Sequence, residues 1–265
     1  MIGTMETRDL DPQELQARTV RAATLVIYRR NPAGGAAQIL LVERNATLNF
    51  AGGATVFPGG KVDPADRDLA ATLGGEIEVT AARIAGVRET LEETGLVVGV
   101  SGPIDGGVAA DARRMLLLHG KLAPVLDAFG WTLNLDQLVQ FARWWPRHRA
   151  ERIFDTRFFL ADLGTGAVDI EVDATENRHM FWASANEALE LAAAGRIRVI
   201  FPTRRNLERL ALFDTFEAAR DHALAFGAET ISPFIAERDG KPWLMIPDGR
   251  GYPVLGEPLS TAQRT

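Results

Sequence analysis

Residues 88–96 read Arg-Glu-Thr-Leu-Glu-Glu-Thr-Gly-Leu, and this stretch decides the fold of the chain. It indicates the end of a helix over 81–94, because good helix formers fill that segment. Three apolar residues in it are spaced for one face of a helix, namely Ile84, Val87 and Leu91. Gly95 follows at the position where a glycine commonly ends a helix.

Three glutamates of this helix, Glu89, Glu92 and Glu93, follow an i, i+3, i+4 spacing and share one face. Like charges at these spacings repel, and anionic side chains near a helix C-terminus are unfavourable with the macrodipole. Two explanations are open. One is a solvated acidic face; the other is a hard-cation site in which Mg²⁺ or Mn²⁺ removes the repulsion.

A glycine-rich turn, Phe57-Pro-Gly-Gly-Lys61, precedes the helix. Gly60 and the stretch 88–96 together resemble the Nudix box, the signature of the Nudix hydrolases. The second half of the signature matches, except that Thr90 replaces the usual aliphatic residue. The first half departs, because residues 61–79 form an insertion and Thr80 stands where the family has its first glutamate. Acidic residues that could compensate are Asp63, Glu76 and Glu78.

The resemblance implies an α/β fold, a Nudix-type α/β/α sandwich with a mixed β-sheet, and an enzyme that uses Mg²⁺ or Mn²⁺. By the same resemblance Glu92 and Glu93 are the main metal ligands, and Glu89 is either a third ligand or the general base. Arg88 would hold Glu89 in place by a charge-assisted pair. The carbonyl of Gly60 would complete the coordination sphere.

A second signature resembles that of coenzyme A-directed Nudix enzymes. It consists of Leu40, Leu41 and Arg44, followed by the glycine-rich turn that begins at Phe57. The middle of this signature differs from the family pattern, since Asn45 replaces a small residue and Asn49 falls where a second arginine is expected. The alternative interpretation is two buried strand leucines and a surface cation.

These signatures imply hydrolysis of CoA or acyl-CoA to 3′,5′-ADP and (acyl-)4′-phosphopantetheine. The alternatives are a Nudix hydrolase that acts on ADP-ribose, NADH or another nucleoside diphosphate conjugate, and a catalytically silent Nudix domain that binds nucleotides. The intact glutamates argue against the silent domain, and Thr80 argues for it.

Aromatic residues suggest where a nucleotide would bind. Phe57 and Trp144 are candidates to contact substrate, and Arg44 and Arg147 are candidates to take phosphate. The alternative interpretation is that Trp144 and Trp145 lie at a strand end and seal the core. This interpretation is favoured for one of the two tryptophans, and the role of the other stays open. The segment 152–159 looks like the long-insert acyl-CoA diphosphatase-like branch of the family. Glu176 is an additional metal ligand or base, or else a structural glutamate.

The domain organisation follows from the same patterns. We expect an N-terminal arm (1–18), a Nudix domain (19–195) with a helical insert at about 105–140, and a C-terminal helical extension (196–265) packed on the same domain. Strands are expected at 19–29, 38–43, 96–100, 154–163 and 180–182. Further helices are expected from 111, 122, 184, 202 and 214, and a terminal hairpin at 231–247 turns at Asp239-Gly240.

Composition narrows the class of protein. The 265 residues carry a net charge of −6, which leaves no overall basic field for nucleic acid. Cysteine is absent, which excludes disulfides, thiolate zinc and a cysteine nucleophile. No apolar stretch reaches the length of a membrane span, so we expect a cytoplasmic protein with a small-molecule partner and no membrane partner. Dimerisation is common in the family, and a homodimer is compatible with the resemblance.

Overall fold

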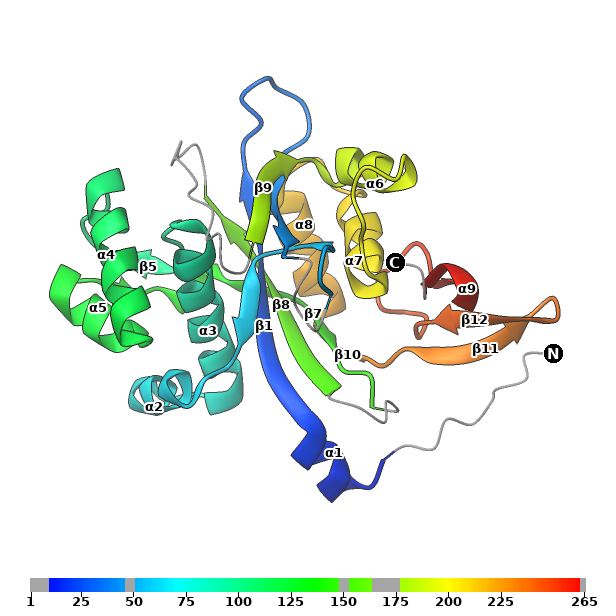
Figure 1. Cartoon of the computed structure of the whole chain (residues 1–265), viewed down its shortest axis with the longest axis horizontal. Helices are drawn as coiled ribbons and strands as arrows, with labels where there is room; N and C mark the ends of the chain where they lie inside the picture. Colours follow the sequence, from blue (N-terminus) through cyan, green and yellow to red (C-terminus); the bar gives the residue numbers. More distant parts are fainter. Residues whose placement is uncertain (1–9, 46–50, 148–152, 164–176, 263–265) are drawn as a thin grey trace.

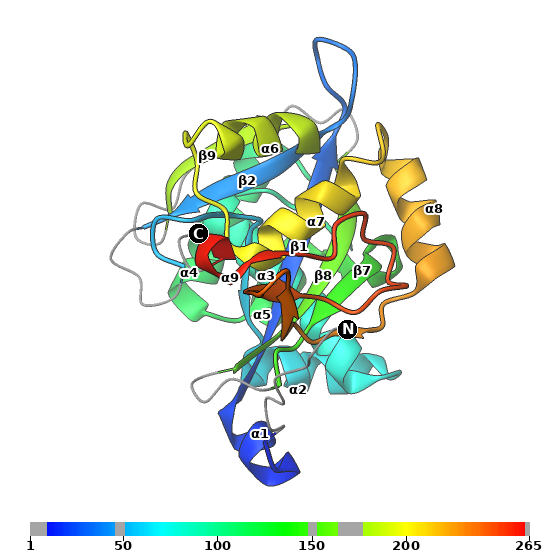
Figure 2. The ribbon, with the colours of Figure 1, turned by 90° about the vertical axis from the view of Figure 1, so that its right-hand side faces the viewer.

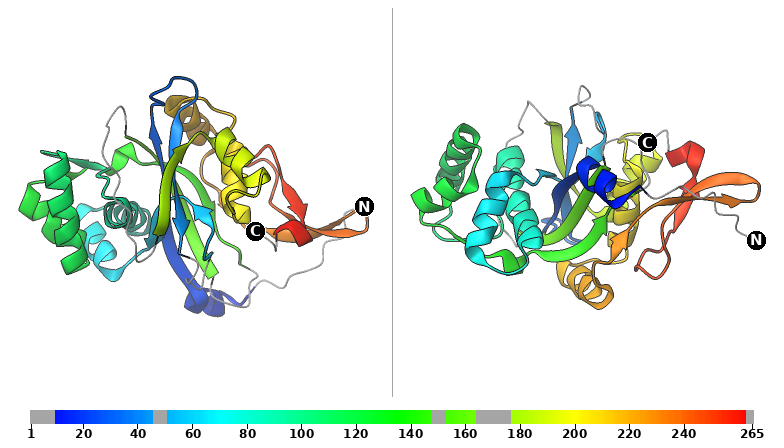
Figure 3. Two further views of the ribbon diagram at one scale, coloured as in Figure 1. Left: turned by 45° about the horizontal axis from the view of Figure 1, so that its top comes forward. Right: turned by 90° about the horizontal axis from the view of Figure 1, so that it is seen from below.

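The computed structural model describes residues 10–45, 51–147, 153–163 and 177–262. Within these ranges eight strands form one mixed sheet, and helices cover both of its faces (Figures 1 and 3). The main path of the sheet runs β10-β7-β8-β1-β2-β3, with β4 paired to β1 and β9 paired to β2. The expected α/β sandwich with a mixed sheet is therefore confirmed. The strands are β1 Thr19–Arg29, β2 Gln38–Arg44, β3 Thr55–Val56, β4 Gly59–Lys61, β7 Val139–Trp144, β8 Ile153–Asp162, β9 Asn177–Ala183 and β10 Thr230–Ile231.

The centre of the sheet is the parallel pair β1–β8, which runs in register from Thr19 opposite Ile153 to Tyr28 opposite Asp162. β1 pairs with β2 only at its end, at Tyr28 and Arg29. Nearer its start, β1 pairs with β4, and β2 pairs with β3. The glycine-rich segment 55–61 thus bridges β1 and β2 where their direct pairing has ended.

On one side of the sheet α3 Ile77–Thr94 packs against β1 and β4, with α2 Pro64–Leu73 beside it (Figure 1). α4 Gly106–His119 packs on α3, and α5 Leu122–Phe129 packs on α4, farther from the sheet. Leu25 and Ile27 of β1 point to this face and pack with Ile84 and Leu91 of α3 in one core cluster. A Cβ at Gly86 of α3 would lie 2.8 Å from a methyl carbon of Leu25. The absent side chain therefore lets α3 approach the sheet closely.

The opposite face is covered by α6 Ala185–Ala193, α7 Phe201–Leu210 and α8 Phe216–Phe226 (Figure 2). Val26 and Tyr28, which alternate with the residues that face α3, belong to a second core cluster on this side. The smaller elements are α1 Pro12–Arg18, the pair β5 Val100–Ser101 and β6 Thr132–Leu133, the 3₁₀ helix Leu135–Gln137, the sheet β11 Phe234–Arg238, β12 Lys241–Met245 and β13 Gly256–Pro258, and α9 Leu259–Ala262.

Several expected elements differ from the structure. The glutamate helix begins at Ile77 rather than 81, and the inserted segment 61–79 contains α2 rather than being a loop. The strand expected at 96–100 is wrong, since only Val100 of it pairs in a strand. The C-terminal segment is not only helical, because β10 joins the main sheet and β11 to β13 form a sheet of their own. The terminal hairpin is confirmed, and its turn residues Asp239 and Gly240 both have positive φ.

The boundaries of the arm, the domain and the extension stay predictions. None of the helices in the described ranges combines the length and the apolar character needed to cross a bilayer.

Candidate functional site

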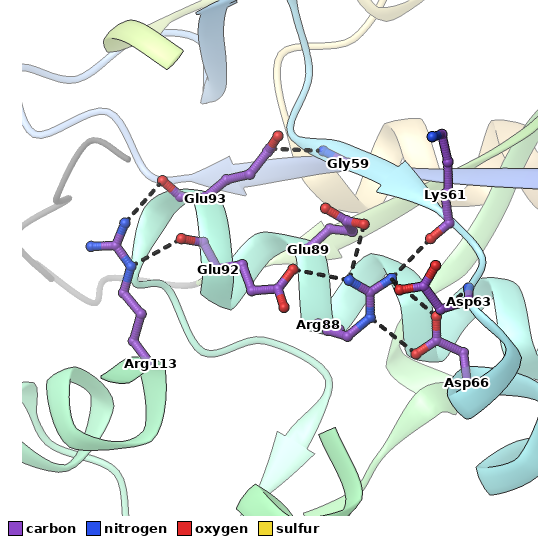
Figure 4. A network of polar contacts seen from close by, with 9 residues as sticks. All are labelled: Gly59, Lys61, Asp63, Asp66, Arg88, Glu89, Glu92, Glu93 and Arg113. Atoms are coloured by element: carbon purple, nitrogen blue, oxygen red, sulfur yellow. Dashed lines mark hydrogen bonds and ion pairs between the residues drawn. The ribbon is translucent and has the colours of Figure 1, made fainter. Parts of the chain in front are cut away.

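The C-terminal half of α3 lies against β4, so the glutamates face the glycine-rich turn (Figure 4). The backbone N–H of Gly59 donates to Glu93 Oε2 at 3.0 Å. α3 ends at Gly95, whose φ of 74° suits a glycine and whose N–H donates to the carbonyl of Leu91. The helix end predicted from the sequence is confirmed, and it sets the glutamates beside the turn.

Gly60 is the closest approach of the turn to the helix. A Cβ at this position would overlap with all three carboxyl atoms of Glu89. The missing side chain therefore creates the space in which the Glu89 carboxylate lies. Gly60 pairs with Ala23 of β1, so the position of this space is fixed by the sheet.

Arg88 connects the glutamates to the segment before them. Its Nη1 lies 3.0 Å from Glu89 Oε1 and 2.9 Å from Glu92 Oε2. Its Nη2 donates to the carbonyl of Lys61 at 2.8 Å. Nε and Nη2 each donate to one carboxylate oxygen of Asp66, both at 3.1 Å. One buried guanidinium thus contacts the carboxylates of Glu89, Glu92 and Asp66 closely, that of Asp63 at 3.5 Å, and the turn.

Burial alone would lower the pKa of Arg88, but the bond to Asp66 and the charges of Glu89, Asp66 and Glu92 outweigh burial and raise it. Arg88 therefore stays cationic. The pKa of Glu92 is raised, first because the carboxyl is partly buried, although the charge of Arg88 and its hydrogen bond oppose the shift. The nearby charges of Asp63 and Asp66 raise it further. Burial therefore outweighs the attraction of Arg88 at the Glu92 carboxyl.

Arg113 of α4 approaches the same helix from the insert. Its Nε donates to the carbonyl of Glu92 at 3.0 Å, and its Nη2 donates to the carbonyl of Glu93 at 3.5 Å. A cation here satisfies carbonyls at the C-terminus of α3 and is favourable with the helix dipole. Arg113 therefore offsets part of the cost of placing three carboxylates at that end.

Sequence reasoning missed Asp66 and named other residues as the compensating acid. Glu78 pairs instead with Arg21 at 2.9 Å and with Arg67 at 3.5 Å. Glu76 is exposed, and Asp63 lies 3.5 Å from Arg88 with about half of its side chain exposed. Asp66 is the buried partner of Arg88. The signal for it was Asp63-Pro64 with an acid three positions after Asp63, a typical helix start within the insertion. No comparable signal points to Arg113.

The side chains of the site have the chemistry of a cation site. Three carboxylates on one helix face, with a Cβ-free backbone beside Glu89, are the oxygen donors that Mg²⁺ and Mn²⁺ prefer. As the structure has them, Glu92 is turned to Arg88 and Glu93 to Gly59, and the described residues contain no ready group of three acidic, His or Cys side chains around a metal position. The donor chemistry fits a hard divalent cation, and the carboxylates would turn from protein donors to hold it.

Two predicted substrate residues lie elsewhere. Phe57 and Trp144 are each 2% exposed and belong to the core cluster on the face opposite α3. Phe57 packs edge-on against Phe158, and Trp144 Nε1 donates to the hydroxyl of Tyr252 at 3.2 Å. Both are core residues, so the structure does not bring them to the glutamates. This agrees with the core interpretation favoured for one tryptophan.

The other three candidates are placed as follows. Arg44 is half-buried at the end of β2, and its Nε is buried without a hydrogen-bond partner among the described residues. Arg147 follows β7, and its guanidinium lies 4.5 Å from the ring centre of Trp145. β8 and β1 separate β7 from β4, so Arg147 is on a different part of the sheet from the turn. Glu176 lies outside the described residues.

Comparison with known proteins adds to this geometry. The structure is similar to a NUDIX hydrolase from Alicyclobacillus acidocaldarius, with 26% sequence identity, a TM-score of 0.64, and coverage of 77% of this chain and 96% of that chain. It is also matched to the NUDIX domain of Shewanella oneidensis NrtR complexed with ADP ribose, at 14% identity, a TM-score of 0.41, and coverage of 75% and 90%. A Caenorhabditis elegans Ap4A hydrolase binary complex matches at 19% identity, a TM-score of 0.37, and coverage of 66% and 86%.

No protein-family model matches the chain, and no curated protein matches it. The Alicyclobacillus match therefore carries the comparison, together with the site residues that belong to the signature. Those residues, Gly60, Arg88, Glu89, Glu92 and Glu93, lie together in the structure. Fold, site and similarity support the Nudix hydrolase superfamily, and we conclude that the chain is an enzyme with the Nudix hydrolase fold.

Proposed function

We propose that the protein is a metal-dependent pyrophosphohydrolase that cleaves the diphosphate of a nucleotide conjugate, with CoA or acyl-CoA as the favoured substrate. The observation that carries the proposal is the arrangement around Arg88, which holds Glu89 and Glu92 on one nitrogen beside the space at Gly60. The expected products from CoA are 3′,5′-ADP and 4′-phosphopantetheine. Acyl-CoA would give the acylated pantetheine product.

The site residues have different roles in the proposed hydrolysis. Glu92 and Glu93 would hold Mg²⁺ or Mn²⁺, and the bound cation would neutralise phosphate charge and that of the leaving oxygen. Glu89 is 14% exposed and forms an ion pair with Arg88, so it is oriented and still reaches water. As general base it takes a proton from the water that attacks phosphorus, while the bond from phosphorus to the bridging oxygen breaks. As a third ligand it would instead complete the oxygen donor set.

Support for CoA comes from the signature around β2. Leu40 and Leu41 are fully buried, one in each core cluster, so they act as core residues and do not discriminate between substrates. Arg44 carries the remaining support. Its Nε is buried and has no hydrogen-bond partner among the described residues, so it is suited to bind an anion such as a phosphate. Asn45 and the residue at 49 depart from the signature, which is why other nucleotide conjugates belong in the test.

The deciding experiment measures release of phosphorylated products in Mg²⁺ or Mn²⁺ from CoA, an acyl-CoA, ADP-ribose and NADH, with Glu92→Gln as the inactive control. Fastest turnover of CoA compounds, lost in the variant, is the expected result. Fastest turnover of ADP-ribose or NADH would keep the assigned glutamates and overturn the CoA preference. Binding of a nucleotide with no turnover of any substrate would favour the silent domain.

Gly60→Ala is expected to lower kcat by about 100-fold, the size of effect that a shift of about 1 Å in a positioned group produces. The added methyl group overlaps with the Glu89 carboxylate and forces it to move. Gly106→Ala is the matched control, since a Cβ there meets nothing within 4 Å. A Gly60→Ala enzyme with wild-type kcat would show that the position of Glu89 does not matter.

A cytoplasmic location and a homodimer are further proposals. Light scattering coupled to size-exclusion chromatography would give the mass of the protein in solution and show whether it is a homodimer.

A further inference from the structure

Asp66 reaches the centre of the site from the segment inserted between Gly60 and α3. Its side chain is 1% exposed, the least exposed acidic side chain among the described residues. Oδ1 accepts from Arg88 Nε and Oδ2 accepts from Arg88 Nη2, each at 3.1 Å. This bidentate pair is the strongest geometry available to an arginine and a carboxylate.

The Asp66 carboxylate is itself held in place. Oδ2 also accepts the backbone N–H of Asp63 at 2.9 Å, at the start of α2. Pro64, the first residue of α2, favours a helix start at this point. The carboxylate is therefore fixed by its own helix on one side and by Arg88 on the other.

The planar guanidinium of Arg88 transmits this constraint. Its Nε and Nη2 edge is bound to Asp66, while Nη1 contacts Glu89 and Glu92 (Figure 4). Because the guanidinium is rigid and planar, fixing one edge fixes the direction of the other nitrogen. We propose that Asp66 is a positioning residue, which acts through Arg88 to hold Glu89 and Glu92 in the arrangement used by the proposed hydrolysis. The inference rests on that proposed function.

Other groups near Arg88 do not provide this constraint. Thr80 has no charge to pair with a guanidinium, and Glu78 is occupied by Arg21 and Arg67. Asp63 is about half exposed at 3.5 Å, a distance and exposure at which an ion pair contributes little. The carbonyl of Lys61 takes one proton of Nη2 but carries no charge. Of the described residues around Arg88, only Asp66 combines burial, charge and two-point contact.

The test compares Asp66→Asn with the matched control Asp68→Asn, whose side chain is exposed on the same helix. Asparagine keeps an oxygen for the N–H of Asp63 but turns the other contact with Arg88 into a repulsive one. A positioning role predicts a kcat lowered by about 10- to 100-fold, the range for residues that orient a metal ligand, with KM nearly unchanged. The control should keep wild-type kcat.

A double-mutant cycle with Arg88→Gln separates positioning from a general structural effect. If Asp66 acts through Arg88, adding Asp66→Asn to Arg88→Gln lowers kcat little further. Losses that multiply would overturn the proposal, as would a folded Asp66→Asn enzyme with normal kcat. Asp66→Glu is the second variant, because it keeps the charge and moves the carboxylate by one methylene. A positioning role predicts that it too lowers kcat, and a normal kcat would count against that role.

A readout without turnover keeps this inference distinct from the proposed function. Isothermal titration calorimetry measures the binding of Mn²⁺ to the wild-type protein and to Asp66→Asn. The Mn²⁺ affinity of the variant should be lower by about 10-fold or more. Failure of the wild type to hydrolyse any substrate would overturn the proposed function. The Mn²⁺ titration would still show whether Asp66 positions the metal-binding carboxylates. Equal Mn²⁺ affinity of the two folded proteins would overturn the positioning role.

Discussion

Glu92→Gln is expected to lower kcat by more than about 100-fold, beyond the loss caused by changing a residue that only orients a metal ligand. Glu92 is one of the three carboxylates on this face of α3, and burial is the first cause of its raised pKa. Glutamine keeps the size of the side chain and removes the charge that a divalent cation needs. Steady-state kinetics at saturating Mg²⁺ measure the loss.

Glu93→Gln should reduce kcat to a similar degree, because Glu93 is the second ligand in the proposed site. Glu76→Gln, at the exposed start of the same helix, is the matched control and should leave kcat unchanged. A Glu92→Gln enzyme as fast as the wild type would remove Glu92 from the machinery. Equal losses in Glu76→Gln would point instead to a general effect of charge on α3.

Arg88→Met is expected to reduce the free energy of unfolding by about 3–5 kcal/mol, the range for removing one partner of a buried ion pair. Methionine fills much of the same space but leaves Asp66 buried, 1% exposed, without its cation. It also leaves Glu89 and Glu92 facing each other with no positive charge between them. Urea unfolding followed by circular dichroism measures the change.

Arg114→Met is the control for this prediction. Arg114 forms an ion pair with Asp111 on the surface of α4 and is 76% exposed, so its loss should cost no more than about 1 kcal/mol. Adding Asp66→Leu to Arg88→Met should recover part of the lost stability, because the buried carboxylate is then gone too. An Arg88→Met protein as stable as the wild type would contradict the prediction that this ion pair stabilises the fold.

Much of the fold could be predicted from local patterns. The β-rich run at β1, the glycine after α3 and the capping residues Ser184 and Glu187 of α6 are local signals, and the structure confirms each of them. The strand expected after Gly95 fails for a physical reason. Leu96 and Val98 are apolar because they pack into the core under α3 and α4, not because they pair in a sheet. A short buried apolar run does not distinguish the two cases.

The site was predictable in part. The glutamates and Gly60 share one recognisable pattern, and the helix start at Asp63-Pro64 is a local signal that includes Asp66. The contact of Asp66 with Arg88 and that of Arg113 with the end of α3 come from tertiary packing. The side of the sheet on which Trp144 lies could not be read from the sequence. A bulge at Gln140–Ala142 shifts the alternation of β7, so that Phe141 and Trp144 enter the same core although they are three residues apart. Without the bulge position, the face of a strand residue cannot be assigned from the sequence.

The parallel pair at the centre of the sheet also constrains how the protein is made. β8, the partner of β1, follows it by roughly 130 residues. At typical elongation rates, about 7 to 27 s of translation therefore separate the synthesis of the two strands. During this interval β1 can pair with β2 and β4 and pack against α3, which are all encoded within the first 94 residues. The segment that carries the glutamates can thus assemble before the sheet closes. The exposed edge of β1 is then the surface that the nascent chain must keep from pairing with other chains.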